Sequence, residues 1–281
     1  TIVAFGTSAP EAAVSISAAL KGSVELAISN VVGSNIMNVL LILGLSSVIY
    51  PLAVKKSTIW FDIPYVFLAS VLLLLFGTMN GSIGRIDGLI FWVLLIIYIF
   101  YMIRLTKKSQ ASNEEFEPAD ENDKIWKLIL LILVGGAMIV AGSNVTVDAA
   151  SNIAAEFGMD ERLIGLTIVA FGTSLPELVT SCIAAKKKET DIAVGNIVGS
   201  NLFNILFVLG TSAVITPIEY RTEFIFDSIV AVLVMVVLWL LVFRKQKLSR
   251  AGGILMLVMY GAYFANLLMQ ALNPAGGIIN P

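Results

Sequence analysis

The chain has 281 residues, of which 58% are hydrophobic and 14% are charged, and its mean hydropathy is +0.91. Soluble domains carry about 25% charged residues, so this composition excludes a single soluble domain, which could not cover its water-facing surface. The net charge of −2 implies no surface for nucleic acid, and zero His with one Cys argues against haem, zinc and iron–sulfur centres.

Apolar segments long enough to cross a bilayer recur along the whole length, which predicts an all-α polytopic membrane protein in contact with lipid. Nine spans are predicted, at residues 1–20, 24–49, 58–78, 84–105, 125–155, 161–185, 190–215, 222–243 and 250–272. Residues 106–124 hold six acidic side chains and are predicted to be a solvated linker between two halves, 1–105 and 125–281.

The basic residues divide unequally between the two ends of these spans. Numbering the loops alternately places 14 Lys and Arg residues on one side and four on the other, namely Lys21, Arg85, Arg162 and Arg221. By the positive-inside rule the first side is cytoplasmic. The linker 106–124 is therefore expected in the cytoplasm and the C-terminus outside.

The two halves contain an internal repeat. Thr1–Gly44 aligns without a gap on Thr167–Gly210 at an offset of 166, and 24 of the 44 positions are identical, where chance would give roughly three to five. The second copy begins five predicted spans after the first, so the two copies are expected to run in opposite directions through the membrane. An inverted-topology repeat of this kind is typical of secondary transporters with a site near the midplane.

The repeat also predicts a further helix. The span at 125–155 precedes the second copy, whereas the first copy opens the chain at Thr1. Symmetry therefore predicts a tenth span upstream, of about 30 residues. On this basis the chain is expected to be an N-terminally shortened form with nine of ten helices, its first half lacking the leading one.

Each copy has a first polar cluster inside an apolar helix. The two clusters are Gly6-Thr7-Ser8-Ala9-Pro10-Glu11 and Gly172-Thr173-Ser174-Leu175-Pro176-Glu177. The spacing places Thr7, Ser8 and Glu11 on one helical face. The proline cannot donate a backbone hydrogen bond and crowds the carbonyl four residues earlier. Carbonyl oxygens such as those of Ala4 and Ala170 can then turn inward as additional ligands, as is tolerated where they line a cavity.

A second polar cluster follows in each copy. These clusters are Gly33-Ser34-Asn35-Ile36-Met37-Asn38 and Gly199-Ser200-Asn201-Leu202-Phe203-Asn204, and the Ser and the final Asn of each share a helical face. A single Ser or Thr in a membrane helix is more often structural, and Asn35 and Asn201 could simply cross-link helices. Glu11 and Glu177 differ, because an intramembrane carboxylate is costly and is by default functional.

Brought together, the four clusters would form an all-oxygen cage with a formal charge of −2. Such a cage suits hard cations such as Ca²⁺ and Na⁺. One Ca²⁺, two Na⁺ or two protons would neutralise it. Competition for one set of ligands gives obligatory exchange, because the emptied site carries buried charge that is costly to move.

The two GTSxPE segments and two GSNxxN segments resemble the alpha repeats of the cation/calcium exchanger superfamily, and most closely those of prokaryotic sodium/calcium antiporters. The resemblance covers essentially the whole chain. It implies a ten-helix fold with the ions bound between four central helices, in a prokaryotic inner membrane. It also implies that the span at 125–155 and its missing partner slide across this core.

By the same resemblance, the cation ligands are Thr7, Ser8, Glu11, Ser34, Asn38, Thr173, Ser174, Glu177, Ser200 and Asn204, together with the main-chain oxygens of Ala4 and Ala170. Some relatives place Asp where Asn204 stands. Since this chain has Asn at both equivalent positions, a third acidic group is not expected in the site.

The sequence favours a Ca²⁺ antiporter driven by Na⁺, since Na⁺ needs several neutral oxygens whereas a proton needs only a carboxylate. A Ca²⁺/H⁺ exchanger of the same superfamily is the alternative, and a cation channel is less consistent with inverted repeats and broken helices. An intramembrane hydrolase is disfavoured because neither His nor an Asp pair accompanies the serines. We therefore expect no enzyme activity and no cofactor, and the sequence indicates nothing about protein partners.

Overall fold

The computed structural model describes residues 2–110 and 161–272, together with isolated residues between 126 and 156. In this part of the chain, six helical segments are long and apolar enough to cross a membrane: Val24–Ile49, Thr58–Asn80, Arg85–Lys107, Thr190–Ile215, Glu223–Val242 and Arg250–Gln270. A bent pair, Glu161–Thr173 and Leu175–Lys186, makes a seventh if it is counted as one span. These seven coincide with predicted spans. Two predicted spans are not among the seven. In the span predicted at 1–20, Ala9–Leu20 is a shorter apolar helix, and the span predicted at 125–155 lies outside the continuously described residues, so the count of nine stays a prediction.

Two of these spans form the centre of the bundle. In the apolar 18-residue window of each of these two spans, 78% of the residues are buried, against 22–39% in the windows of the other four. The first consists of α3 (Val24–Met37), a π-helical segment η1 (Asn38–Leu43) and α4 (Gly44–Ile49). The second consists of α11 (Thr190–Phe203), η4 (Asn204–Leu209) and α12 (Gly210–Ile215). Both π-helical segments therefore begin at the last Asn of a predicted cluster, and π-helical insertions are frequent at functional sites.

The helices that carry the Glu residues are broken at equivalent places. In the first half α1 (Ile2–Thr7) ends before Ser8 and α2 (Ala9–Leu20) begins after it. In the second half α8 (Glu161–Ile164), η3 (Gly165–Val169) and α9 (Ala170–Thr173) are followed by α10 (Leu175–Lys186), with a bend of 47° at Ser174. The proline in the first turn of α2 and of α10 accounts for both breaks, as the sequence predicts.

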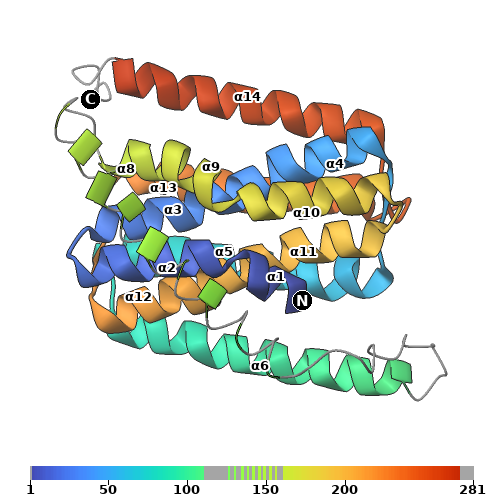
Figure 1. The fold of residues 1–281 in the computed structure, drawn as a ribbon, viewed down its shortest axis with the longest axis horizontal. Coiled ribbons are helices and arrows are strands. Elements are labelled where there is room, and N and C mark those ends of the chain that lie inside the picture. Colours follow the sequence, from blue (N-terminus) through green and yellow to red (C-terminus); the bar gives the residue numbers. More distant parts are fainter. Residues whose placement is uncertain are drawn as a thin grey trace.

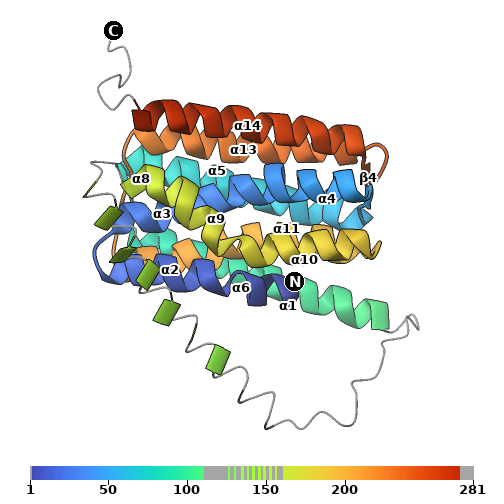
Figure 2. The same cartoon turned by 45° about the horizontal axis from the view of Figure 1, so that its top comes forward.

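The remaining helices surround this centre. They are η2 (Thr58–Asp62) continued by α5 (Ile63–Asn80), α6 (Arg85–Gln110), α13 (Glu223–Val242) and α14 (Arg250–Leu272). In both views α6 and α14 lie at opposite edges of the bundle (Figures 1 and 2). Figure 1 also shows that α3–α4 and α11–α12 run in opposite directions, as do α1–α2 and α9–α10.

Two short antiparallel ladders join the halves at the ends of the bundle. β1 (Leu52–Ala53) pairs with β4 (Lys247–Leu248), and β2 (Ser82–Ile83) pairs with β3 (Ile218–Glu219). Each ladder takes one strand from the first half and one from the second. The loops of the two halves are therefore tied to each other by backbone hydrogen bonds as well as by helix packing.

Glycines allow the outer helices to cross the central ones closely. An added Cβ at Gly253 of α14 would lie 2.6 Å from the carbonyl oxygen of Gly44, and one at Gly88 of α6 would lie 2.6 Å from that of Gly210. Both distances are shorter than any normal van der Waals contact, and backbone atoms cannot move aside as a flexible side chain can. Each outer helix thus packs on the central span of the other half through a pair of glycines.

We expect Gly253→Ala to destabilise the protein. Overpacking of a tight contact costs typically 1–3 kcal/mol, which should lower the midpoint of thermal unfolding in detergent. Gly261→Ala is the matched control, because it lies on the same helix and its added Cβ would meet nothing within 4 Å. Equal midpoints for the two variants would show that α14 is not held against α4 at this crossing.

Candidate cation-binding site

The two broken helices bring Glu11 and Glu177 into the interior, where both side chains are fully buried. Each carboxylate is bound by the serine at the helix break of the opposite half. Ser8 Oγ donates to Glu177 Oε1 at 2.8 Å, and Ser174 Oγ donates to Glu11 Oε1 at 2.9 Å. The first clusters of the two copies, which are far apart in sequence, therefore form one reciprocal pair.

The second clusters contribute hydroxyl groups to the same region. Ser200 Oγ donates to Glu177 Oε1 at 3.2 Å, so this carboxylate oxygen receives two hydroxyl donors. In the other half Ser34 Oγ lies 3.5 Å from Thr173 Oγ1. The two halves differ at this point, although the residues are equivalent in the repeat.

The Asn residues of the second clusters form a ring across the centre of the bundle. Asn35 Nδ2 donates to the backbone oxygen of Asn201 at 3.2 Å, and Asn201 Nδ2 donates to that of Asn35 at 3.1 Å. Asn38 Nδ2 donates to Asn201 Oδ1 at 2.9 Å, and Asn204 Nδ2 donates to Asn35 Oδ1 at 3.1 Å. These bonds hold the two central spans together at their π-helical segments.

Among the side chains of the predicted ligands that the structure describes, four buried oxygens have no hydrogen-bond partner. They are Glu11 Oε2, Glu177 Oε2, Asn38 Oδ1 and Asn204 Oδ1, and each belongs to a residue with no exposed surface. Buried polar atoms are normally paired, and an unpaired one costs about 1–3 kcal/mol, more for a charged group. Four unpaired acceptors at two equivalent pairs of positions indicate that the site is built for a ligand that binds oxygen.

Other predicted ligands, the Thr hydroxyl groups and the main-chain oxygens of Ala4 and Ala170, lie beside these groups. These atoms already take part in hydrogen bonds within the protein. Thr7 Oγ1 contacts the carbonyl oxygen of Ala4 at 3.3 Å, and Thr173 Oγ1 contacts that of Ala170 at 3.3 Å. Each carbonyl oxygen also accepts the backbone N–H of the serine at the break, at 3.0 Å. These two main-chain oxygens are therefore better satisfied than the four side-chain oxygens.

Sequence reasoning missed an outer layer of four residues. Asn30 Nδ2 donates to Ser15 Oγ at 2.9 Å, and Asn196 Nδ2 donates to Ser181 Oγ at 3.3 Å. The amide oxygens of these Asn residues accept hydrogen bonds from Thr173 at 3.0 Å and from Thr7 at 3.1 Å. Asn30 and Asn196 are equivalent in the repeat at the offset of 166, and so are Ser15 and Ser181. Inspection of every polar residue that is identical in the two copies could therefore have found them.

The acidic charge of the site comes from two residues. Among the described residues, no group of three or more His, Cys, Asp and Glu side chains could hold a metal ion. The fixed charge of the arrangement with both Glu residues ionised is −2.

A separate buried ion pair lies outside this region. Arg162 Nη1 lies 2.6 Å from Asp227 Oδ2, and the side chains are 6% and 0% exposed. Tyr263 donates to Asp227 Oδ1 at 3.0 Å, and Arg162 Nη2 donates to Gln270 at 2.6 Å. The charge count assigns Arg162 to the less basic side of the membrane. The structure adds that its guanidinium is buried inside the bundle, where it neutralises the carboxylate of Asp227.

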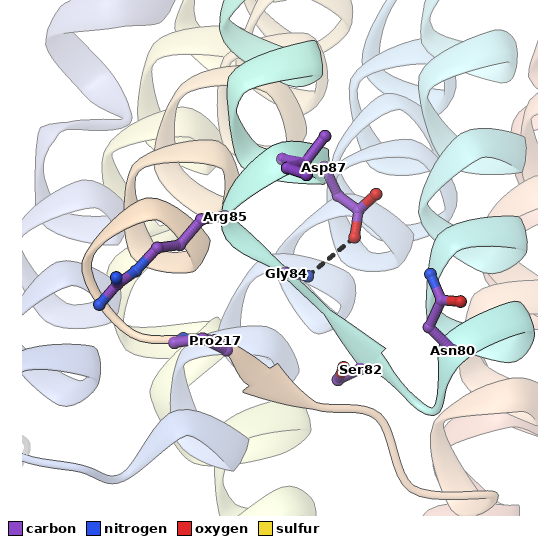
Figure 3. A pocket seen from close by; sticks show the side chains of 7 residues that line it. Asn80, Ser82, Gly84, Arg85, Asp87 and Pro217 are labelled. Carbon is purple, nitrogen blue, oxygen red and sulfur yellow. Dashed lines mark hydrogen bonds between the residues drawn. The ribbon is translucent and has the colours of Figure 1, made fainter.

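The open pocket at β2 and β3 is a poor candidate for a cation site. Its volume is about 690 Å³, and its lining includes Asn80, Arg85, Asp87 and Pro217 (Figure 3). Asp87 Oδ2 accepts the backbone N–H of Gly84 at 2.8 Å, which caps the start of α6. The carboxylate is thus used by the fold, and a cationic side chain lies on the same wall.

Comparison with known proteins gives one consistent family. The family model described as sodium/calcium exchanger protein matches residues 1–104 and 127–269. The putative antiporter CaxA of Alkalimonas amylolytica is 35% identical over 276 residues, covering 94% of this chain and 85% of its own length. The sodium/calcium exchanger MaX1 of Methanosarcina acetivorans is 28% identical over 305 residues, covering 95% and 87%. A solved structure of the sodium-calcium exchanger NCX_Mj, soaked with 2.5 mM Na⁺ and 0.1 mM Ca²⁺, has a TM-score of 0.70 at 30% identity, covering 94% of this chain and 84% of that chain.

Proposed function

Because the chain belongs to the sodium/calcium exchanger family of integral membrane proteins, we propose that it is a secondary antiporter that exchanges Ca²⁺ for Na⁺. The observation that carries the proposal is the set of four buried, unpaired oxygens on Glu11, Glu177, Asn38 and Asn204. Carboxylate and amide oxygens are ligands that Ca²⁺ prefers. A bound Ca²⁺ would satisfy all four oxygens and neutralise both carboxylates.

The other proposed ligands complete an oxygen shell. The hydroxyl groups of Ser8, Ser174 and Ser200 donate their protons to the carboxylates, so their lone pairs remain available for a cation. The same holds for Thr7 and Thr173, whose protons go to the outer Asn residues. The full proposed set comprises Thr7, Ser8, Glu11, Ser34, Asn38, Thr173, Ser174, Glu177, Ser200 and Asn204, with the main-chain oxygens of Ala4 and Ala170.

Exchange follows from the charge of this shell. One Ca²⁺ balances the two carboxylates, and two Na⁺ do so equally. With neither cation, two buried negative charges would have to cross the low-dielectric interior, which is strongly unfavourable. The site can therefore change sides when it is loaded and resists doing so when it is empty, which couples the two fluxes.

We propose that the two halves, 1–105 and 125–281, are inverted repeats that alternate access to this site. The opposite directions of corresponding helices support this arrangement (Figure 1). Further support comes from the hydrogen bonds, since the Ser–Glu and Asn–Asn pairs occur twice with equivalent partners exchanged between the halves.

We also propose an orientation in a prokaryotic inner membrane. Lys55 pairs with Asp191 at 3.0 Å, and β1–β4 pairing places Lys247 opposite Ala53, so these Lys residues share one end of the bundle. Under the positive-inside rule this end is cytoplasmic. The linker 106–124 would then be cytoplasmic and the C-terminus external.

The counter-ion is tested by transport. The protein is reconstituted into liposomes, and Ca²⁺ uptake is measured after an outward Na⁺ gradient is imposed, and separately after a pH gradient alone. We expect uptake with the Na⁺ gradient and none above the protein-free level with the pH gradient. Uptake with the pH gradient alone would assign the protein as a Ca²⁺/H⁺ exchanger, and downhill Ca²⁺ flux without either gradient would indicate a channel.

A further inference from the structure

The hydrogen bonds of the Asn ring determine which way each side-chain amide faces. The backbone oxygens of Asn35 and Asn201 can only accept, so the group that approaches each one must be an amide nitrogen. Asn201 Nδ2 therefore faces Asn35 O at 3.1 Å, and Asn35 Nδ2 faces Asn201 O at 3.2 Å. These two contacts exclude a flipped amide at either residue.

The orientations of the Asn35 and Asn201 amides determine those of the Asn38 and Asn204 amides. Asn201 Oδ1 can only accept, so it is matched by Asn38 Nδ2 at 2.9 Å. Asn35 Oδ1 is matched in the same way by Asn204 Nδ2 at 3.1 Å. A flip of Asn38 or Asn204 would place two oxygens against each other, which is repulsive.

Because the nitrogens of the Asn38 and Asn204 amides are used in the ring, their oxygens point to the opposite side. Asn38 Oδ1 and Asn204 Oδ1 are the oxygens left buried and without a partner. We propose that Asn35 and Asn201 are positioning residues for the cation site, which orient the amides of Asn204 and Asn38 so that oxygen rather than NH₂ faces the ion. This proposal rests on the proposed function, because it assigns these unpaired oxygens to a cation.

The pairing is specific and crosses between the halves. Asn35 sets the amide of Asn204, and Asn201 sets that of Asn38, whereas neither sets the amide of its own cluster. In Asn35→Leu the bond from Asn201 Nδ2 to the backbone of residue 35 is retained, so Asn38 should keep its orientation. Loss of Asn35 should therefore affect one oxygen of the site and leave the other in place.

The test is a rescue experiment on Ca²⁺ transport. The KM for Ca²⁺ is measured from initial rates of Na⁺-driven uptake in proteoliposomes. Asn35→Leu should raise this KM at least tenfold, because the freed amide of Asn204 can turn its NH₂ group toward the cation. Adding Asn204→Asp should bring the KM to within threefold of that of Asn204→Asp alone, since a carboxylate presents an oxygen in either orientation.

The mismatched double variant is the control. Asn35→Leu with Asn38→Asp adds the same negative charge at the equivalent position but leaves the amide of Asn204 free, so its KM should stay high. Rescue by both Asp substitutions would reduce the effect to added charge and overturn the proposal. A KM equal to that of the parent in Asn35→Leu would overturn it directly.

The equivalent pair in the other half repeats the test independently. Asn201→Leu should be rescued by Asn38→Asp and not by Asn204→Asp. If Asn35→Leu and Asn201→Leu both elute as aggregates, the two side chains serve folding and the proposal is wrong. Failure of the proposed function is distinguishable, because the parent protein itself would then show no Na⁺-driven Ca²⁺ uptake.

Discussion

Replacement of either Glu11 or Glu177 by Gln is expected to abolish Ca²⁺ exchange. Both side chains are fully buried, and each keeps one oxygen without a partner. Gln retains the shape but leaves one carboxylate to balance a divalent cation in a low-dielectric site. Removing one member of a buried, hydrogen-bonded charge pair costs about 2–5 kcal/mol or more, which corresponds to a loss of at least about thirtyfold in apparent affinity.

The measurement is the initial rate of Na⁺-driven Ca²⁺ uptake over a range of Ca²⁺ concentrations. Glu219→Gln is the control, because it makes the same substitution at an exposed position in β3 and should transport like the parent. Near-normal exchange by Glu11→Gln or by Glu177→Gln would remove that residue from the set of ligands.

Arg162→Met is expected to destabilise the protein strongly. The substitution keeps an apolar stem but leaves the carboxylate of Asp227, which is 0% exposed, without the guanidinium at 2.6 Å. Breaking a buried ion pair by removing one partner costs about 3–5 kcal/mol. The expected result is a large fall in the midpoint of thermal unfolding in detergent, measured by tryptophan fluorescence or by loss of the monodisperse peak on size exclusion.

Two further variants separate the ion pair from other effects of the substitution. Lys55→Met breaks an exposed pair whose side chains are 63% and 51% exposed, and such pairs contribute less than about 1 kcal/mol. Arg162→Met with Asp227→Leu removes both charges and should recover much of the loss, because a buried pair can often be replaced by apolar residues. A midpoint for Arg162→Met equal to that of Lys55→Met would mean that the buried pair contributes little.

The sequence predicted most of the helical organisation because two signals are independent of tertiary contacts. Hydropathy places the spans, and the segment predicted at 24–49 is observed at Val24–Ile49. The proline of each first cluster predicts a break in its helix, observed at Ser8 and Ser174. The repeat then singled out the positions at which polar residues occur twice in apolar surroundings.

The sequence could not reveal how those polar groups bond to one another. Which serine donates to which carboxylate depends on contacts between residues 169 positions apart, as for Ser8 and Glu177. Periodicity places Asn35 and Asn38 on neighbouring turns but cannot tell which amide atom is free. The burial of Arg162 was missed for a related reason, since its partner Asp227 lies 65 residues further along the chain.

The most direct test of a shared cation site is Ca²⁺ binding to the purified protein in detergent, measured by isothermal titration or by equilibrium binding of radioactive Ca²⁺. We expect Na⁺ to displace the bound Ca²⁺ competitively, because both ions use the same buried oxygens. We also expect the double variant Glu11→Gln with Glu177→Gln no longer to bind Ca²⁺. Ca²⁺ binding that persists in this double variant, or that Na⁺ does not displace, would contradict a shared site built from the two carboxylates.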